Sequence, residues 1–145
     1  MIDHRQLGVD LFNYVWTLLD KSDRAPEDED ELIHAAHASR FHWGKVGTAE
    51  NFGRGEWQIS RVYSVLGRAE PALHHARRYL EICEQNGIAD WDLAFAYEAL
   101  ARASRVAGDE EAARDYLRRA REAGEQIADK DDREHFEADI AELAG

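Results

Sequence analysis

The sequence predicts an all-α protein, built from about seven antiparallel helices in a single domain. Apolar residues recur at the spacing of a helix over nearly the whole chain. The chain contains only two prolines, Pro26 and Pro71, and each stands where a helix can begin. No segment resembles a ladder of strands, and 145 residues are enough to bury one hydrophobic core.

The expected helices can be placed in order along the chain. They are predicted over residues 3–20, 26–45, 48–66, 71–85, 90–106, 109–127 and 130–143. The first has apolar residues on one side at Leu7, Leu11, Val15, Leu18 and Leu19. The acidic segment KSDRAPEDED follows, and its carboxylates favour the start of the second helix because a helix N-terminus is partially positive. Asn86 and Gly87 end the fourth helix, as asparagine and glycine often do.

Two stretches of the sequence repeat. YSVLGRAEPALHHARRYLEI and SRVAGDEEAARDYLRRAREA align on Gly67 and Gly108, which are 41 residues apart, and an alanine follows each glycine after five residues (Ala72 and Ala113). Before each glycine come a large, a small, and then an aromatic or small residue: Ile59, Ser60 and Tyr63 in the first copy, Leu100, Ala101 and Ser104 in the second.

These residues resemble the tetratricopeptide repeat (TPR), a helical hairpin of about 34 residues that stacks into a superhelix. The resemblance covers roughly residues 52–128, with departures: Glu56 and Tyr97 replace the tryptophan that often opens the motif, and the repeat is longer. It implies a right-handed TPR-like array with three parts. These are an N-terminal helical pair (1–47), two long degenerate hairpins (48–128) and a C-terminal capping helix (129–145).

The resemblance also implies a binding groove, because the first helix of each hairpin lines the concave face of such arrays. By offset from the two glycines, the groove residues are Arg54, Trp57, Arg61, Ser64 and Val65, with Phe95, Glu98, Arg102, Arg105 and Val106. Guanidinium groups pair with carboxylates or phosphates, and a tryptophan ring offers a flat face for stacking. The alternative is that the arginines form internal ion pairs with Glu56, Glu98 and nearby carboxylates.

The histidine-rich stretch ELIHAAHASRFHW is a second candidate site. His34, His37 and His42 share one broad side of a helix, and Glu31 and His34 match the Glu-x-x-His spacing of helical metal sites. His34 and His42 are about 12 Å apart along a helix, so they cannot bind one ion together. Three explanations stay open: helix packing, walls of the arginine groove together with Arg40, or a divalent metal held by Glu31, His34 and His37.

Charge and composition restrict the partners. The net charge is −12, from 30 acidic and 18 basic residues, which disfavours nucleic acid because phosphates must be neutralised by positive charge. A single cysteine, Cys83, excludes an internal disulfide framework and favours a reducing compartment. No segment has the length of a membrane span or the pattern of a signal peptide, so a cytoplasmic location without a membrane partner is expected.

The sequence therefore predicts a cytoplasmic TPR-like interaction module without a cofactor. Its expected partner is a protein or peptide with an acidic segment, or a small anionic ligand. The alternatives are a metal-binding protein or small enzyme that uses the histidine-rich helix, and a self-associating structural protein such as a homodimer. No Gly-x-Ser-x-Gly motif and no glycine-rich phosphate loop occurs in the chain.

Overall fold

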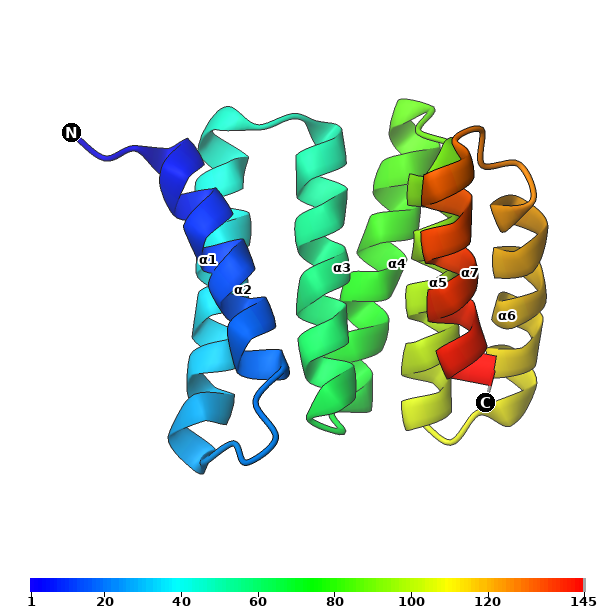
Figure 1. Ribbon diagram of the computed structural model, residues 1–145, viewed down its shortest axis with the longest axis horizontal. Helices are drawn as coiled ribbons and strands as arrows, with labels where there is room; N and C mark the ends of the chain where they lie inside the picture. Colours follow the sequence, from blue (N-terminus) through cyan, green and yellow to red (C-terminus); the bar gives the residue numbers. More distant parts are fainter. Residues whose placement is uncertain (145) are drawn as a thin grey trace.

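The computed structural model describes residues 1–144, which form seven α-helices and contain no strand. The helices are α1 (His4–Leu19), α2 (Pro26–Val46), α3 (Ala49–Val65), α4 (Ala69–Asn86), α5 (Asp90–Val106), α6 (Glu110–Gly124) and α7 (Lys130–Ala144). They stand side by side along the long axis of the molecule (Figure 1). The predicted all-α class and the seven helices are thus confirmed. No helix in this part of the chain is both long and apolar enough to cross a membrane.

The helices are arranged as consecutive hairpins, since α1 packs on α2, α3 on α4 and α5 on α6. The odd-numbered helices also adjoin one another in the order α1, α3, α5, α7, although α1 meets α3 only over a short length. No two even-numbered helices of residues 1–144 adjoin each other. The odd-numbered helices therefore form one layer, and the face of this layer is shared by segments from the whole chain.

The turns inside the second and third hairpins have the same geometry. Gly67 and Gly108 have φ angles of 74° and 79°, in the left-handed region where glycine pays no steric cost. After each glycine, the next amide donates to a carbonyl five residues earlier: Arg68 to Tyr63 and Asp109 to Ser104. The equivalence of the two glycines, predicted from the repeat, is confirmed at the level of the backbone.

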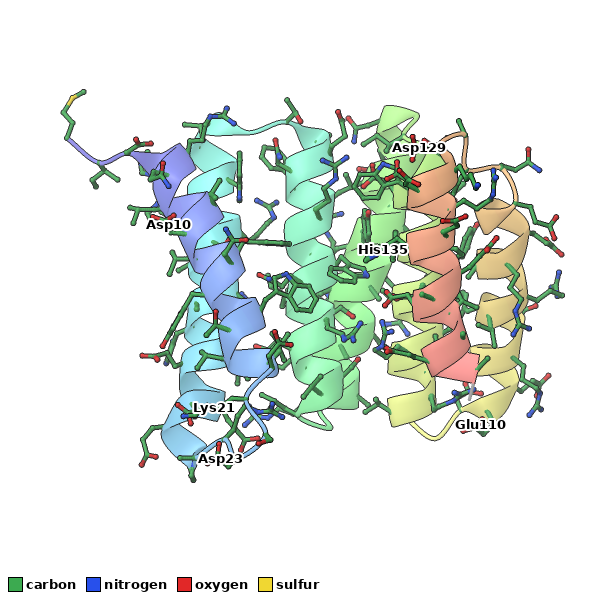
Figure 2. The ribbon with its side chains drawn as sticks, in the orientation of Figure 1. Asp10, Lys21, Asp23, Glu110, Asp129 and His135 are labelled. Carbon is green, nitrogen blue, oxygen red and sulfur yellow. The ribbon has the colours of Figure 1, made fainter. Side chains whose placement is uncertain are left out.

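Aspartates cap several helices. Asp3, Asp109 and Asp129 each accept a hydrogen bond from the backbone amide three residues later, at 2.9 to 3.0 Å. Such caps satisfy amides that the first turn of a helix leaves without a partner. Figure 2 shows Asp129 beside the beginning of α7 and Glu110 at the beginning of α6. Part of the negative charge of the chain is thus placed where helix dipoles favour it.

Helix α5 packs against four other helices, α3, α4, α6 and α7. Because several helices approach it closely, α5 itself needs small side chains at the contacts. Its buried residues include Ala94, Ala96, Ala99, Ala101 and Ala103. Alanine permits short distances between helix axes and has the highest helix propensity. This closely packed helix supplies Trp91 and Phe95 to the site described below.

The last helix, α7, docks through Phe136, Ile140 and Leu143, all of them buried. Phe136 packs edge-on against Phe95 of α5, with ring centres 5.1 Å apart. The sixth helix ends at Gly124 and not at Ile127 as predicted, because the chain must reverse there to bring α7 back onto α5. Ile127 is still buried, but it lies in the connecting turn.

Replacement of Phe136 tests this docking. Phe136→Ala should lower the free energy of unfolding by about 3–5 kcal/mol, since it removes a fully buried aromatic ring and leaves a void. Urea unfolding followed by circular dichroism measures the loss. Glu137→Ala, at an exposed position of the same helix, is the control and should change stability by less than about 0.5 kcal/mol. A loss for Phe136→Ala as small as that of the control would contradict the docking.

Candidate functional site

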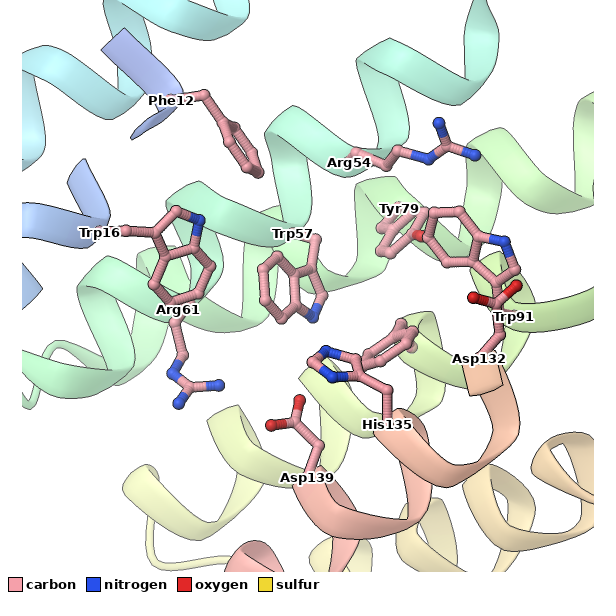
Figure 3. A pocket seen from close by; sticks show the side chains of 11 residues that line it. Phe12, Trp16, Arg54, Trp57, Arg61, Tyr79, Trp91, Asp132, His135 and Asp139 are labelled. Atoms are coloured by element: carbon pink, nitrogen blue, oxygen red, sulfur yellow. The ribbon is translucent and has the colours of Figure 1, made fainter. Parts of the chain in front are cut away.

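A cavity of about 630 Å³ opens on the face of the odd-numbered helices (Figure 3). Its walls come from five helices: Phe12 and Trp16 (α1), Arg54, Trp57 and Arg61 (α3), Tyr79 (α4), Trp91 and Phe95 (α5), and Asp132, His135 and Asp139 (α7). Sites for small molecules usually measure about 300–1,000 Å³ and combine apolar walls with a few polar groups. This cavity has both properties.

Aromatic rings form a continuous strip along the cavity. The ring centres are 6.4 Å apart for Phe12 and Trp16, 5.7 Å for Trp16 and Trp57, 5.9 Å for Trp57 and Phe95, and 6.1 Å for Phe95 and Trp91. These separations are typical of favourable aromatic pairs. The strip crosses from α1 over α3 to α5, and we call these five residues the aromatic strip.

The charge of Arg54 is neutralised within the protein. Its Nε and one terminal nitrogen each donate to a different oxygen of Asp92, both at 3.1 Å, and the guanidinium carbon lies 4.2 Å from the centre of the Trp91 ring. The hydroxyl of Tyr79 also donates to Asp92, at 2.5 Å. Burial, reinforced by the charge of Asp92, raises the pKa of Tyr79 well above its ordinary value. Arg54 therefore serves to hold Trp91 in place.

Glu98 lies behind the cavity wall with no exposed surface. Its Oε1 accepts hydrogen bonds from Nε1 of Trp57 at 3.1 Å and from Arg102 at 2.7 Å, whereas its Oε2 has no partner within residues 1–144. Burial raises the pKa of Glu98 to about 7; the charge of Arg102 opposes this, and the neighbouring carboxyl group of Asp139 adds to it. Glu98 thereby fixes the orientation of the Trp57 ring.

Arg61 differs from the other arginines of the predicted groove. It lines the cavity, is half-buried, and makes no hydrogen bond or ion pair within the described part of the chain. Its guanidinium carbon lies 6.0 Å from the centre of the Trp16 ring. Burial and then the charge of Arg102 lower the pKa of Arg61, against the attraction of Glu98, Asp139 and Glu142. The cavity wall thus contains a guanidinium group without a direct counter-ion.

The remaining residues of the predicted groove do not line the cavity. Arg102 is paired with Glu98, Arg105 donates to the carbonyl of Leu143, and Arg40 is paired with Glu56 at 3.1 Å. Arg105 also lies 3.9 Å from Glu110, so internal ion pairs, the alternative explanation for the arginines, account for Arg40, Arg54, Arg102 and Arg105. Of the predicted set, the structure brings Arg54, Trp57, Arg61 and Phe95 together around one cavity.

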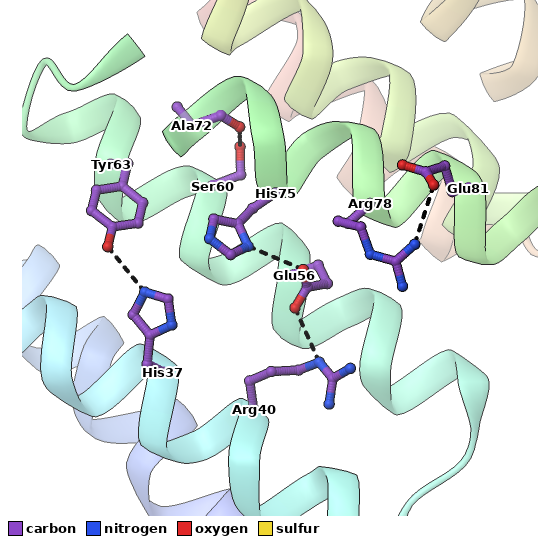
Figure 4. Close-up of polar contacts among 9 residues, drawn as sticks. All are labelled: His37, Arg40, Glu56, Ser60, Tyr63, Ala72, His75, Arg78 and Glu81. Carbon is purple, nitrogen blue, oxygen red and sulfur yellow. Dashed lines mark hydrogen bonds and ion pairs between the residues drawn. The ribbon is translucent and has the colours of Figure 1, made fainter. Parts of the chain in front are cut away.

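The histidine-rich helix takes part in a polar network on another side of α3 (Figure 4). Nε2 of His37 and the hydroxyl of Tyr63 are hydrogen-bonded at 3.0 Å, and the Tyr63 ring stacks on His75 with ring centres 6.0 Å apart. Nδ1 of His75 lies 3.0 Å from Glu56, which also pairs with Arg40. Burial, followed by the nearby His75, lowers the pKa of His37. The network joins α2, α3 and α4.

The other members of the histidine-rich stretch do not share a partner. His34 is exposed, Glu31 accepts a hydrogen bond from the hydroxyl of Tyr14, and Nδ1 of His42 lies 2.9 Å from Nδ1 of His4. Within residues 1–144, no three His, Cys, Asp or Glu side chains are grouped so that they could hold a metal ion. Glu31, His34, His37 and His42 are also absent from the cavity wall.

Several cavity residues were not predicted from the sequence. Phe12 and Trp16 are one helical turn apart on α1, as are His135 and Asp139 on α7, so each pair shares a helix face. Polar or aromatic pairs at this spacing on the odd-numbered helices, beside the apolar face, are a signal that could have identified them. Trp91 and Tyr79 carry no such signal, because their positions depend on how α4 and α5 pack.

Comparison with known proteins identifies no relative: no protein-family model, curated protein or solved structure matches the chain. Functional inference therefore depends on the chemistry of the cavity itself.

The pKa of Glu98 predicts a specific pH dependence. A folded-state pKa of about 7, above the ordinary 4.5, means that the folded protein binds more protons than the unfolded chain between these values. This group therefore contributes stability at low pH that is lost as the pH rises towards 7. Glu98→Gln should remove the loss, so that the variant gains stability relative to the wild type as pH increases. Urea unfolding between about pH 4.5 and pH 8 measures the difference, with the exposed Glu142→Gln as control; parallel curves for Glu98→Gln and the wild type would refute the assignment.

The two histidines of α2 should differ in their effect on stability. His37→Ala removes the hydrogen bond to Tyr63 and should cost about 1–2 kcal/mol in the free energy of unfolding. His34→Ala, at an exposed position one turn earlier, should cost less than about 0.5 kcal/mol. Both are compared with the wild type by urea unfolding at about pH 8, where histidine is uncharged. Equal losses would show that the network around His37 does not stabilise the fold.

Proposed function

We propose that this protein is a cytoplasmic binding module with TPR-like stacking of its hairpins, and that its cavity holds a ligand with an apolar body and an anionic group. Several features support the stacking. The turns at Gly67 and Gly108 are equivalent, and Ala72 and Ala113 are both buried after them. The hydrogen bond from Trp57 to Glu98 connects positions 41 residues apart, which is the repeat length. Corresponding positions of successive hairpins are thus in contact, as stacking requires.

The observation that carries the proposed binding function is the state of Arg61. A half-buried guanidinium group without a direct counter-ion is less stable than a paired one, because burial disfavours an unbalanced charge. A carboxylate, sulfonate or phosphate of a ligand would supply the missing partner through charge-assisted hydrogen bonds. The aromatic strip beside Arg61 supplies the apolar contact area.

The ligand is either a small molecule or a segment of a partner protein, since both can present an anionic group next to an apolar one. The cavity is open on the face of the odd-numbered helices and collects side chains from α1 to α7. Binding would therefore connect the two ends of the chain. It should also raise the free energy of unfolding, by an amount that grows with the logarithm of the ligand concentration above the dissociation constant.

A pair of fluorescent probes tests this proposal. The anionic 1-anilinonaphthalene-8-sulfonate and the neutral N-phenyl-1-naphthylamine have the same rings and differ by the sulfonate. The wild-type protein should bind the anionic probe at one saturable site. Arg61→Gln should weaken that binding about tenfold or more, the usual contribution of a hydrogen bond to a charged group, and leave binding of the neutral probe unchanged.

Arg114→Gln, which removes an exposed arginine of α6, is the matched control and should bind both probes like the wild type. An Arg61→Gln variant that binds the sulfonate as tightly as the wild type would disprove an anion site at Arg61. Unfolding curves of both variants establish that they are folded.

A further inference from the structure

Arg61 has an acidic neighbour across the cavity. Asp139 of α7 also lines the cavity, and both side chains lie towards the same end of it, with Trp91 and Asp132 towards the other (Figure 3). Arg61 and Asp139 are near enough for each charge to be felt, but they form no ion pair with each other, and neither forms one with any other residue of 1–144. Opposite charges thus face one end of the cavity with a gap between them.

The aromatic strip passes this same end of the cavity. Trp16 lies beside Arg61, and Trp57 follows 5.7 Å further along. Nε1 of Trp57 is already bonded to Glu98, so this indole presents ring surface to a ligand and no free donor. An apolar or aromatic group can therefore pack against the strip while a polar group lies between Arg61 and Asp139.

Glu98 lies next to Asp139, behind the cavity wall. It is fully buried, its Oε2 has no partner within residues 1–144, and the carboxyl group of Asp139 is its neighbour. With a pKa of about 7, Glu98 is partly protonated at neutral pH and in that form can donate a proton to Asp139 in a hydrogen bond. Such a bond would hold the carboxyl group of Asp139 at the cavity wall.

From this arrangement we infer that the cavity recognises an aromatic α-amino acid, or a molecule that ends in this head group: Arg61 binds the carboxylate, Asp139 binds the ammonium group, and the aromatic strip packs against the side chain. The inference rests on the proposed function and specifies its ligand. The volume of about 630 Å³ leaves room for further atoms beyond the ring, towards Trp91 and Asp132.

Ligands with a single charge fit the arrangement less well. An anion alone would be attracted by Arg61 but repelled by Asp139. A protonated amine alone would be attracted by Asp139 but repelled by Arg61. A protein N-terminus offers an ammonium group without an adjacent carboxylate, and a C-terminus offers the carboxylate without the ammonium. Only a free α-amino acid head group carries both charges on one carbon atom.

Isothermal titration with three indole compounds tests the inference. L-tryptophan has both charges, N-acetyl-L-tryptophan lacks the ammonium charge, and L-tryptophanamide lacks the carboxylate. Wild-type protein should bind L-tryptophan at one site and each blocked compound about tenfold or more weakly, as expected for loss of one charge-assisted contact.

Two variants assign the contacts. In Arg61→Gln the preference for L-tryptophan over the amide should disappear, and its preference over the N-acetyl compound should remain. In Asp139→Asn the pattern should reverse. Arg114→Gln and the exposed Asp131→Asn are matched controls and should behave like the wild type.

The comparison of the three compounds on the wild-type protein does not depend on any variant. Equal binding of L-tryptophan and of either blocked compound, or no binding of all three, would overturn the inference. If either result occurred but the anilinonaphthalene sulfonate still bound in an Arg61-dependent way, the proposed anion site would stand. Only recognition of the amino-acid head group would then be ruled out. Loss of the sulfonate site would remove both proposals.

Discussion

The hydrogen bonds to the buried carboxyl group of Glu98 are the interaction on which the packing of the helices around the cavity depends. Glu98 lies on α5, and its Oε1 accepts hydrogen bonds from Trp57 of α3 and from Arg102 of its own helix. Asp139 of α7 is its neighbour on the other side. Loss of either donor would leave a carboxyl group without exposed surface still further from satisfied, which is costly, so α3 and α5 must keep their relative positions. The cavity is formed by these two helices together with α1, α4 and α7.

The number and the extent of the helices could be predicted from the sequence because they depend on local signals. Apolar spacing, the prolines and the glycines at the turns are properties of short segments. The observed helix ends differ from the predicted ones by at most about three residues. The repeat also predicted the equivalence of Gly67 and Gly108. The packing of α7 against α5 was harder to predict from the sequence. It depends on how Phe136 and Ile140 pack against helices that are distant in the sequence.

The candidate site was predictable only in part, and Arg54 and Arg61 show why. They are seven residues apart on α3 and share a face, so helical geometry places both on the cavity wall. Whether each guanidinium group is paired depends on the carboxylates of other helices: Asp92 of α5 reaches Arg54, and no carboxylate pairs directly with Arg61 within residues 1–144. Spacing along one helix contains no information about this difference. Nor does it show that His37 bonds to Tyr63 and His42 to His4 while His34 is exposed.

The two turn glycines bear on how an alignment of related sequences should be interpreted. A side chain at Gly67 or Gly108 would meet open space but would strain a backbone with φ near 75°, so selection can retain both glycines for stereochemical reasons alone. Invariance of these two glycines among related sequences would therefore reflect a requirement of the fold. Arg61 and Asp139, by contrast, form no ion pair with each other or with any other residue of 1–144. If both charges persisted together while the surrounding surface drifted, that pattern would be a record of selection for a ligand.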